Sequence, residues 1–158
     1  MRLYPDPILK LPTTPVERFD EGLSAFVDKM RVAMEIGNGV GLAAPQVGVP
    51  KKIAIVFYED SFYALINPRV LYEEGEQDGE EGCLSFPDIY AQVRRPAHAT
   101  VLAQNTKGEE GIYELEGFLA RVFLHEIDHL NGKLFIDRLS PLKRGMIRKK
   151  MTKTRGER

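Results

Sequence analysis

The segment His-Glu-Ile-Asp-His at positions 125–129 constrains the fold of this chain more than any other part of the sequence. Residues four positions apart lie on the same face of a helix, so His125 and His129 can bind one metal ion. Glu126 lies beside them, where it can reach a water molecule at that ion without being a ligand. The flanking residues are apolar and predict a buried helix over about 117–130, ended by Asn131-Gly132. Only three histidines are present in the chain, so two incidental histidines on an amphipathic helix are the weaker interpretation.

Two histidines leave a metal site incomplete, and Cys83 is the strongest candidate for the third ligand. His98 lies in an alternating, strand-like stretch and is interpreted as an ordinary strand residue. The metzincin extension is absent after His129, and the only glutamate beyond the helix is Glu157. A lone cysteine is by itself more often a small buried hydrophobic residue, and a nucleophile is the other alternative. Together with two histidines, however, a cysteine leaves the fourth tetrahedral position open, as catalytic sites do.

The composition is that of an ordinary globular protein, and we expect a single domain over residues 1–158. A formal net charge of −1 excludes a global basic field that would recruit nucleic acid or membranes. No apolar run approaches the roughly 18 residues that span a bilayer, and the N-terminus lacks the apolar core of a signal peptide. The single cysteine excludes an intramolecular disulfide and is typical of a reducing cytosol. The charge is nevertheless uneven, because residues 142–158 form a tail rich in Lys and Arg.

The residue pattern predicts an α+β fold, in which antiparallel β-strands pack around the metal-binding helix. The first 18 residues contain four prolines and are expected to form an extended arm. Asp20 is expected to cap a helix over 21–37, and Ser140-Pro141 to begin a basic C-terminal helix. An acidic, glycine-containing loop is expected after residue 74. Strands are expected at 52–58, 62–67, 70–74, 90–95, 100–104 and 111–116.

Two further motifs precede the metal-binding helix, at 39–46 and 81–85. The first, Gly-Val-Gly-Leu-Ala-Ala-Pro-Gln, lacks the Lys-Ser/Thr of a phosphate-binding loop, and its glycines allow a ligand to approach the backbone closely. Its last residue, Gln46, can aim an amide at a developing oxyanion or be a surface loop residue, and the residues alone leave both open. In the second motif, the backbone N–H of Leu84 directly follows Cys83 and can be a second oxyanion donor.

These three motifs, Gly39–Gln46, Glu81–Ser85 and His125–His129, resemble in this order the three motifs of peptide deformylases. The resemblance extends from about residue 3 to residue 141, and the ordered set is highly specific. It implies a metal-dependent hydrolase that removes the N-formyl group from the N-terminal formyl-methionine of nascent polypeptides and releases formate. It also implies one Fe²⁺ per chain, with Zn²⁺, Ni²⁺ or Co²⁺ able to substitute.

The resemblance further implies a role for individual residues. Cys83, His125 and His129 would be the metal ligands, and Glu126 the general acid and base. Gln46 and the Leu84 amide would form the oxyanion hole. Four residues would contact the peptide, the first three of them as strand-like backbone: Val40, Gly41, Gly82 and Tyr90.

Three other positions are compared with the family in the same way. Glu81 resembles an acidic residue that pairs with an arginine, and Arg95 is the candidate partner. Phe118 and Arg121 fall in the methionine pocket, where Arg121 replaces an aliphatic residue of some members.

Two alternatives to this function remain at the level of the sequence. A zinc endopeptidase would use the same helix but would cleave unformylated peptides. A non-enzymatic, metal-stabilised binding module would hydrolyse neither formylated nor unformylated peptides. For the deformylase, the expected partners are the nascent formyl-Met polypeptide and the ribosome near its exit tunnel, contacted through the basic C-terminal helix. A solvated charged terminus is the alternative for that helix. The expected location is the cytoplasm of a bacterium, with an organelle as the other origin.

Overall fold

The structure is a computed structural model that describes residues 1–156, and it has the α+β class that the sequence predicts. The α-helices within this range are α1 (Glu21–Ile36), α2 (Gly117–Leu130) and α3 (Pro141–Gly156). The strands are β1 (Gly41–Ala43), β2 (Ile53–Tyr58), β3 (Ser61–Glu74), β4 (Gln77–Cys83), β5 (Phe86–Arg95), β6 (His98–Gln104) and β7 (Glu110–Glu116). Short 3-10 helices are η1 (Pro7–Lys10), η2 (Ala44–Val47) and η3 (Phe135–Arg138). Residues 157–158 of the predicted basic tail lie outside the described residues.

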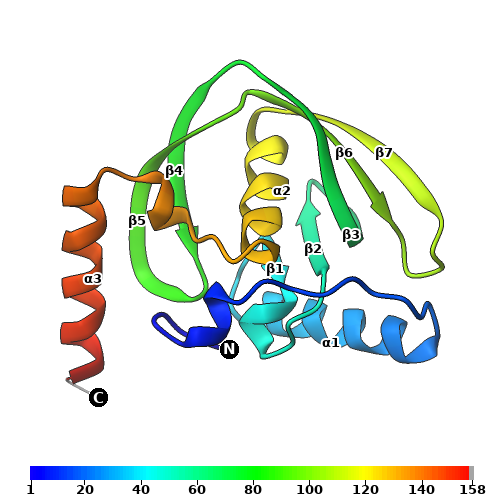
Figure 1. Ribbon diagram of the computed structural model, residues 1–158, viewed down its shortest axis with the longest axis horizontal. Coiled ribbons are helices and arrows are strands. Elements are labelled where there is room, and N and C mark those ends of the chain that lie inside the picture. The colour runs from blue at the N-terminus through cyan, green and yellow to red at the C-terminus, as the bar shows by residue number, and fades with distance from the viewer. Residues whose placement is uncertain (157–158) are drawn as a thin grey trace.

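The strands form two antiparallel sheets with helix α2 between them (Figure 1). Five strands pair in the order β1-β2-β3-β6-β7, so that β1 is one edge of this sheet. Strands β4 and β5 form a separate hairpin on the other side of α2. This arrangement places α2, which contains the His-Glu-Ile-Asp-His segment, at the centre of the molecule.

The alternation of β2 shows how the larger sheet is covered on both faces. Ile53 and Ile55 belong to the core cluster formed with α1, whereas Ala54 and Val56 belong to the cluster formed with α2. Successive side chains of a strand point to opposite faces, so a continuous apolar run is what a strand buried on both faces requires. Helix α1 begins where predicted, with the Asp20 carboxylate accepting a hydrogen bond from the Leu23 N–H.

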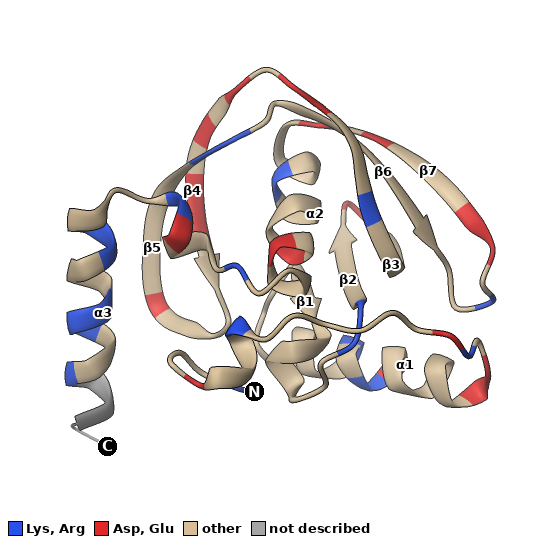
Figure 2. Ribbon diagram, in the orientation of Figure 1, with Lys and Arg blue, Asp and Glu red and all other residues tan. Residues whose placement is uncertain are grey.

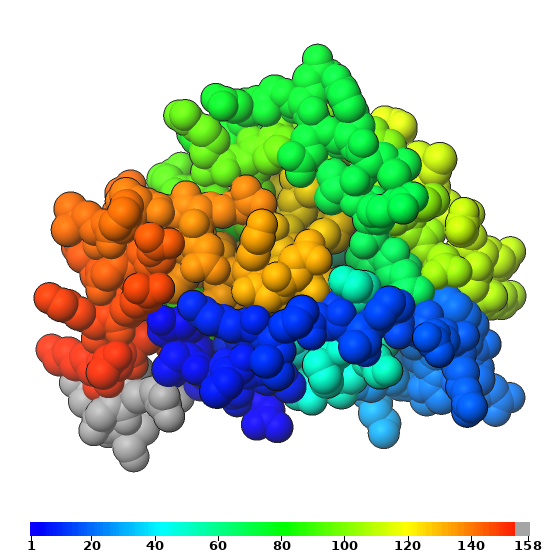
Figure 3. All heavy atoms as spheres, viewed as in Figure 1, coloured from blue at the N-terminus to red at the C-terminus, as the bar shows by residue number. Residues whose placement is uncertain are grey.

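A third core cluster joins the two ends of the chain to the β4–β5 hairpin. Its members come from the N-terminal arm, β5, η3 and α3, and include Tyr4, Leu9, Phe86, Phe135 and Met151. In the space-filling view the arm lies across the front of the molecule, next to the segment that follows α2 (Figure 3). The arm is therefore not simply extended, as the prolines suggested, because η1 turns it into this core.

Two predicted features of the strands are wrong. The stretches at 62–67 and 70–74 belong to one strand, β3, which is interrupted by register shifts. The acidic stretch predicted as a loop contains β4, whose partner β5 supplies basic residues opposite it. Asp78 pairs with Arg94 across the hairpin, and the Arg94 Nε–Asp78 Oδ1 distance is 3.0 Å. Cross-strand pairing thus overrides the poor strand propensity of Asp, Glu and Gly.

Helix α3 packs against the hairpin on one side only. Ile147 and Met151 contribute to the third core cluster, whereas Leu142 and Met146 are exposed. Figure 2 shows Lys and Arg along the helix. None of the helices within residues 1–156 combines the length and the apolar composition needed to cross a bilayer.

Candidate active site

The structure brings Cys83, His125 and His129 together, although they come from a hairpin and a helix. One ligand atom from each residue lies within 4.8 Å of the other two, and the Cys83 Sγ–His129 Nε2 distance is 3.4 Å. Ligands about 2.0–2.3 Å from one tetrahedral ion lie roughly 3.3–3.8 Å apart, so this donor set fits a single ion. Cys83 ends β4, and both histidines lie on the inner face of α2.

The charges around this centre also favour a cation. Burial lowers the pKa of His125, but contacts with Cys83, Glu126 and Glu81 outweigh it and raise this pKa well above its ordinary value. Burial and the neighbouring His125 lower the pKa of His129 to about 3. The pair therefore favours one positive charge, not two. The negative surroundings that favour a proton at this position also favour a metal ion.

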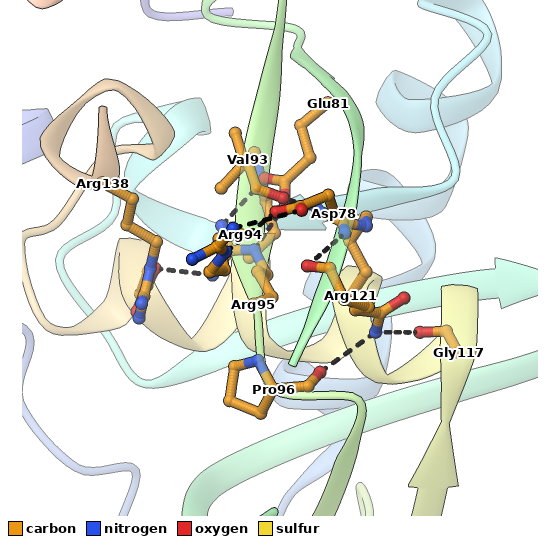
Figure 4. A network of polar contacts seen from close by, with 12 residues as sticks. Asp78, Glu81, Val93, Arg94, Arg95, Pro96, Gly117, Arg121 and Arg138 are labelled. Atoms are coloured by element: carbon orange, nitrogen blue, oxygen red, sulfur yellow. Dashed lines mark hydrogen bonds and ion pairs between the residues drawn. The ribbon is translucent and has the colours of Figure 1, made fainter. Parts of the chain in front are cut away.

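Glu81 orients His125, the first candidate ligand. Its Oε1 is 2.8 Å from His125 Nδ1, which leaves Nε2 for the metal centre. The same buried carboxylate accepts hydrogen bonds from Arg95 and from Arg121, with an Arg95 Nη2–Oε1 distance of 2.8 Å and an Arg121 Nη1–Oε2 distance of 2.6 Å (Figure 4). Burial favours the neutral acid, but the hydrogen bonds from Arg95 and His125 outweigh it and hold the pKa of Glu81 well below its ordinary value. The pairing of Glu81 with Arg95 predicted from the sequence is therefore present.

Asp128 extends this network away from the metal centre. It accepts from Arg95 Nη1 at 2.9 Å, and from Arg138 Nε at 2.6 Å and Nη2 at 2.9 Å. Arg138 belongs to η3, so the bidentate pair joins α2 to the segment that leads into α3. Asp128 is the fourth residue of the His-Glu-Ile-Asp-His segment, but its position alone did not indicate a partner.

Glu126 is buried beside the metal centre, and burial raises its pKa to about 7. Its Oε1 lacks a hydrogen-bond partner within the described residues. Gly41 of β1 approaches the same side chain so closely that a Cβ built there would lie 2.5 Å from Glu126 Oε2. A larger residue at position 41 would therefore force the Glu126 side chain to move, whereas the predicted close approach of these glycines to a ligand stays a prediction.

Gln46 is buried and lies next to the ligand cysteine, so it is not a surface loop residue. Its Nε2 is 3.5 Å from Cys83 Sγ and donates to Ser85 Oγ at 3.1 Å. Leu84 follows Cys83 in the turn between β4 and β5, so its backbone N–H adjoins the same ligand. Both residues predicted as oxyanion donors therefore lie next to Cys83 and line the same cavity.

A cavity of about 500 Å³ opens onto these residues. Its lining includes every predicted peptide-contacting residue, namely Val40, Gly41, Gly82 and Tyr90, together with Phe118 and Arg121 of the predicted methionine pocket. Arg121 is buried, and its guanidinium also donates to the Val93 carbonyl at 2.8 Å. The arginine is therefore held in the wall of the cavity by polar contacts (Figure 4).

Sequence reasoning missed the contacts made by Ser85, Asp128 and Arg138. Arg138 follows α2 and Asp128 lies within it, and no rule of sequence spacing predicts that these two residues pair. Ser85 stands in a recognised motif, but its partner is a backbone carbonyl in the N-terminal arm, which residue types do not reveal.

Comparison with known proteins gives one consistent result. Residues 1–145 match the family model described as polypeptide deformylase. The peptide deformylase of Thermotoga maritima is 46% identical over 152 residues, which cover 96% of this chain and 93% of that protein. The peptide deformylase of Acidobacterium capsulatum is 47% identical over 155 residues, covering 95% and 91%. The crystal structure of a peptide deformylase from Legionella pneumophila superposes with a TM-score of 0.93 at 41% identity, covering 98% of this chain and 94% of that one.

Replacing Glu81 with Gln should destabilise the metal-free protein by roughly 3–5 kcal/mol at neutral pH, because the buried Arg121 loses its anionic partner and the buried Arg95 keeps only Asp128. The pKa of Glu81 is lowered in the folded state, so its contribution is present above the ordinary value of 4.5 and is lost as the pH falls below it. The difference in free energy of unfolding, measured with urea, should therefore be large at pH 7 and shrink at acid pH. Glu80→Gln, at an exposed neighbouring position, is the matched control. Equal stability of wild type and Glu81→Gln at pH 7 would contradict this account.

Proposed function

The chain belongs to the polypeptide deformylase family, and we propose that it hydrolyses formyl groups with a metal ion held by Cys83, His125 and His129. Removal of the N-formyl group from nascent peptides is the activity of this family, and the chain is an enzyme of that kind. The observation that carries the assignment of residues is the meeting of one thiolate and two imidazoles beside a buried glutamate, in the wall of a cavity.

When bound, a divalent ion supplies Lewis-acid chemistry that polarises the formyl carbonyl and acidifies a water molecule. Cys83 and the two histidines would hold the ion. Glu81 keeps His125 in the tautomer whose Nε2 is unprotonated.

Glu126 is the general acid and base. Its pKa of about 7 in the protein without metal places proton uptake and release near neutral pH. The carboxylate accepts the proton of the attacking water and delivers it to the leaving amine. Formate and a free α-amino group are the products.

Gln46 and the Leu84 N–H stabilise the tetrahedral oxyanion. Each donor is worth about 3 kcal/mol of barrier on the scale of other oxyanion holes. Their place beside Cys83 supports this role.

The peptide binds as an added strand. Strand β1 is an edge of its sheet, and its residue Gly41, with Val40 before it and Gly82 of β4, lines the cavity. Tyr90 lies over Gly82, where a Cβ would meet the tyrosine ring at 2.6 Å, and contacts the bound peptide. Phe118 and Arg121 border the pocket for the methionine side chain.

Fe²⁺ is the working ion that we propose, with Zn²⁺, Ni²⁺ or Co²⁺ as substitutes. A thiolate ligand neutralises part of the ion's charge and favours softer metals over magnesium or calcium. The enzyme acts in the cytoplasm of a bacterium or in an organelle, where formylated chains are made.

Helix α3 docks on the ribosome near its exit tunnel. Its exposed basic residues include Lys143, Arg148 and Lys149, and ribosomal RNA offers the complementary charge. The bidentate Arg138–Asp128 pair fixes the segment that leads into this helix against the catalytic helix.

Glu126→Gln should retain the metal and lose turnover by roughly 10²–10⁴-fold, because the amide cannot accept a proton. Cys83→Ala should lose both the metal and activity. Metal content and formate release from a formyl-Met peptide are the measurements, and a matched unformylated peptide should remain uncut. Loss of metal from Glu126→Gln would make Glu126 a ligand, and full activity would remove it from the mechanism. Cleavage of the unformylated peptide would indicate an endopeptidase.

The iron-loaded enzyme should lose activity over time in air, whereas the nickel-loaded enzyme should keep it. Both the ferrous ion and the Cys83 thiolate are open to oxidation, but only the first differs between the two preparations. Activity is followed in air and under argon. Equal decay of both forms in air would exclude metal redox as the cause.

Replacing Lys143, Arg148 and Lys149 with Gln should weaken co-sedimentation with ribosomes and reduce its dependence on salt. Hydrolysis of a short formyl peptide should be unchanged, because none of these residues lines the cavity. Charge substitution is preferable to removal of α3, since Ile147 and Met151 pack in the core. The control replaces three other exposed lysines with Gln: Lys10, Lys29 and Lys107. Co-sedimentation that is equal for the two triple variants would contradict the docking role.

A further inference from the structure

The N-terminal arm is joined to the oxyanion side chain by one buried serine. Ser85 is fully buried, accepts a hydrogen bond from Gln46 Nε2 at 3.1 Å and donates one to the Arg2 carbonyl at 2.8 Å. The three residues are far apart in sequence, since Ser85 and Arg2 are separated by 83 positions. Their contacts lie behind the metal centre and not in the open cavity, because neither Ser85 nor Arg2 is among the lining residues.

The hydrogen bonds of Gln46 leave one of its two amide protons for the metal centre. Its Oε1 accepts from the Ala43 N–H at 3.0 Å, which fixes which end of the amide is oxygen and which is nitrogen. Of the two N–H groups on Nε2, one is used by Ser85. The other is on the side of Cys83 Sγ, at an Nε2–Sγ distance of 3.5 Å. This is the side on which an oxyanion donor is needed.

The Arg2 carbonyl determines how the Ser85 hydroxyl is turned. A hydroxyl has one proton and two lone pairs, and its torsion is free unless a partner fixes it. Donation to Arg2 uses the proton and leaves a lone pair for Gln46. Without this acceptor, the hydroxyl proton could turn toward the Gln46 amide, which would then lose its own acceptor.

Arg2 is itself held by its main chain. Its N–H donates to the Gln46 carbonyl at 2.7 Å, and the Tyr4 N–H donates to the Ser85 carbonyl at 3.0 Å. The Tyr4 ring stacks on Phe86, with ring centroids 4.9 Å apart. By contrast, the Arg2 side chain is largely exposed and pairs with Asp6. Position 2 therefore contributes backbone and not a particular side chain.

We propose that Ser85 and the main chain of Arg2 are positioning elements of deformylation, which hold the Gln46 amide so that its second N–H meets the developing oxyanion. The inference rests on the proposed oxyanion role of Gln46. It makes the N-terminal arm part of the catalytic apparatus, although the arm contributes no group that touches the substrate.

A double-mutant cycle with Gln46 tests the proposal. Ser85→Ala should lower kcat by roughly 10–100-fold, the scale of a slightly misplaced catalytic group, with little change in KM because the contact forms only in the transition state. In a Gln46→Leu background, which already lacks the donor, Ser85→Ala should have almost no further effect on kcat. A merely structural role for Ser85 would instead lower kcat equally in both backgrounds, and this result would overturn the proposal.

A second readout does not depend on turnover. In the zinc-loaded protein, the Gln46 amide proton that Ser85 accepts should have an NMR shift displaced from that of a free glutamine amide and should exchange slowly with solvent. Ser85→Ala should return this shift toward the free value and speed the exchange. Unchanged Gln46 amide signals in Ser85→Ala would overturn the proposal.

The contribution of the Arg2 main chain to kcat is tested by removing it. A chain whose first two residues are removed by proteolysis after synthesis, so that Leu3 is its first residue and the Arg2 carbonyl is absent, should reproduce the kcat loss of Ser85→Ala. The matched control is Thr13→Val, which removes another buried hydroxyl that donates to a main-chain carbonyl, at 2.6 Å from Leu130 O, without contacting Gln46. It should leave kcat unchanged, and a loss as large as that of Ser85→Ala would show that any buried hydroxyl matters equally.

The outcomes distinguish this inference from the function on which it rests. If Gln46→Leu alone leaves kcat unchanged, the oxyanion role of Gln46 fails, and the positioning role fails with it. If Gln46→Leu is slow but Ser85→Ala is not, only the positioning role fails.

Discussion

The buried carboxylate of Glu81 is the interaction on which the rest of the site depends. It is the common acceptor for Arg95, Arg121 and the Nδ1 of His125, so one anion pairs with two guanidinium groups and orients a candidate metal ligand, while Asp128 is a second anion beside Arg95. Isolated buried charges are strongly unfavourable, but these buried groups form ion pairs and hydrogen bonds with one another. Because the members come from β4, β5 and α2, the same contacts also hold the hairpin against the catalytic helix.

The residues of the site come from three segments of the chain. Strand β1 places a sheet edge at the cavity, and its Gly41 lets the backbone pass the Glu126 carboxylate. The hairpin supplies Cys83, and α2 supplies both histidines and the proposed base, Glu126. None of the three could form the centre alone, since a catalytic arrangement requires groups held in position by packing on rigid elements. The N-terminal arm supports these segments through main-chain contacts with Gln46 and Ser85.

Helical periodicity and the chemistry of metal ligands were sufficient to predict much of this from the sequence. The spacing of His125 and His129 predicted a shared face, and elimination of other donors pointed to Cys83, which the structure places beside them. Strand β4 was missed because its acidic residues have low strand propensity, and only the pairing with β5 explains them. The contacts of Ser85 were not predictable, because a backbone carbonyl is present at every position and no residue type marks it. Arg121 was placed in the cavity wall, but its hydrogen bonds depend on the backbone geometry of β5.

The distribution of the ligands along the chain has a consequence for the protein's own synthesis. Cys83 and His129 are separated by 46 positions, so at about 5–20 residues per second the thiol is made roughly 2–9 s before its last partner. During this interval no complete donor set exists, and loop closure has still to bring the two segments together. Until α2 has been synthesised and has docked beside the hairpin, the thiol has neither of the two imidazoles that lie next to it in the folded protein.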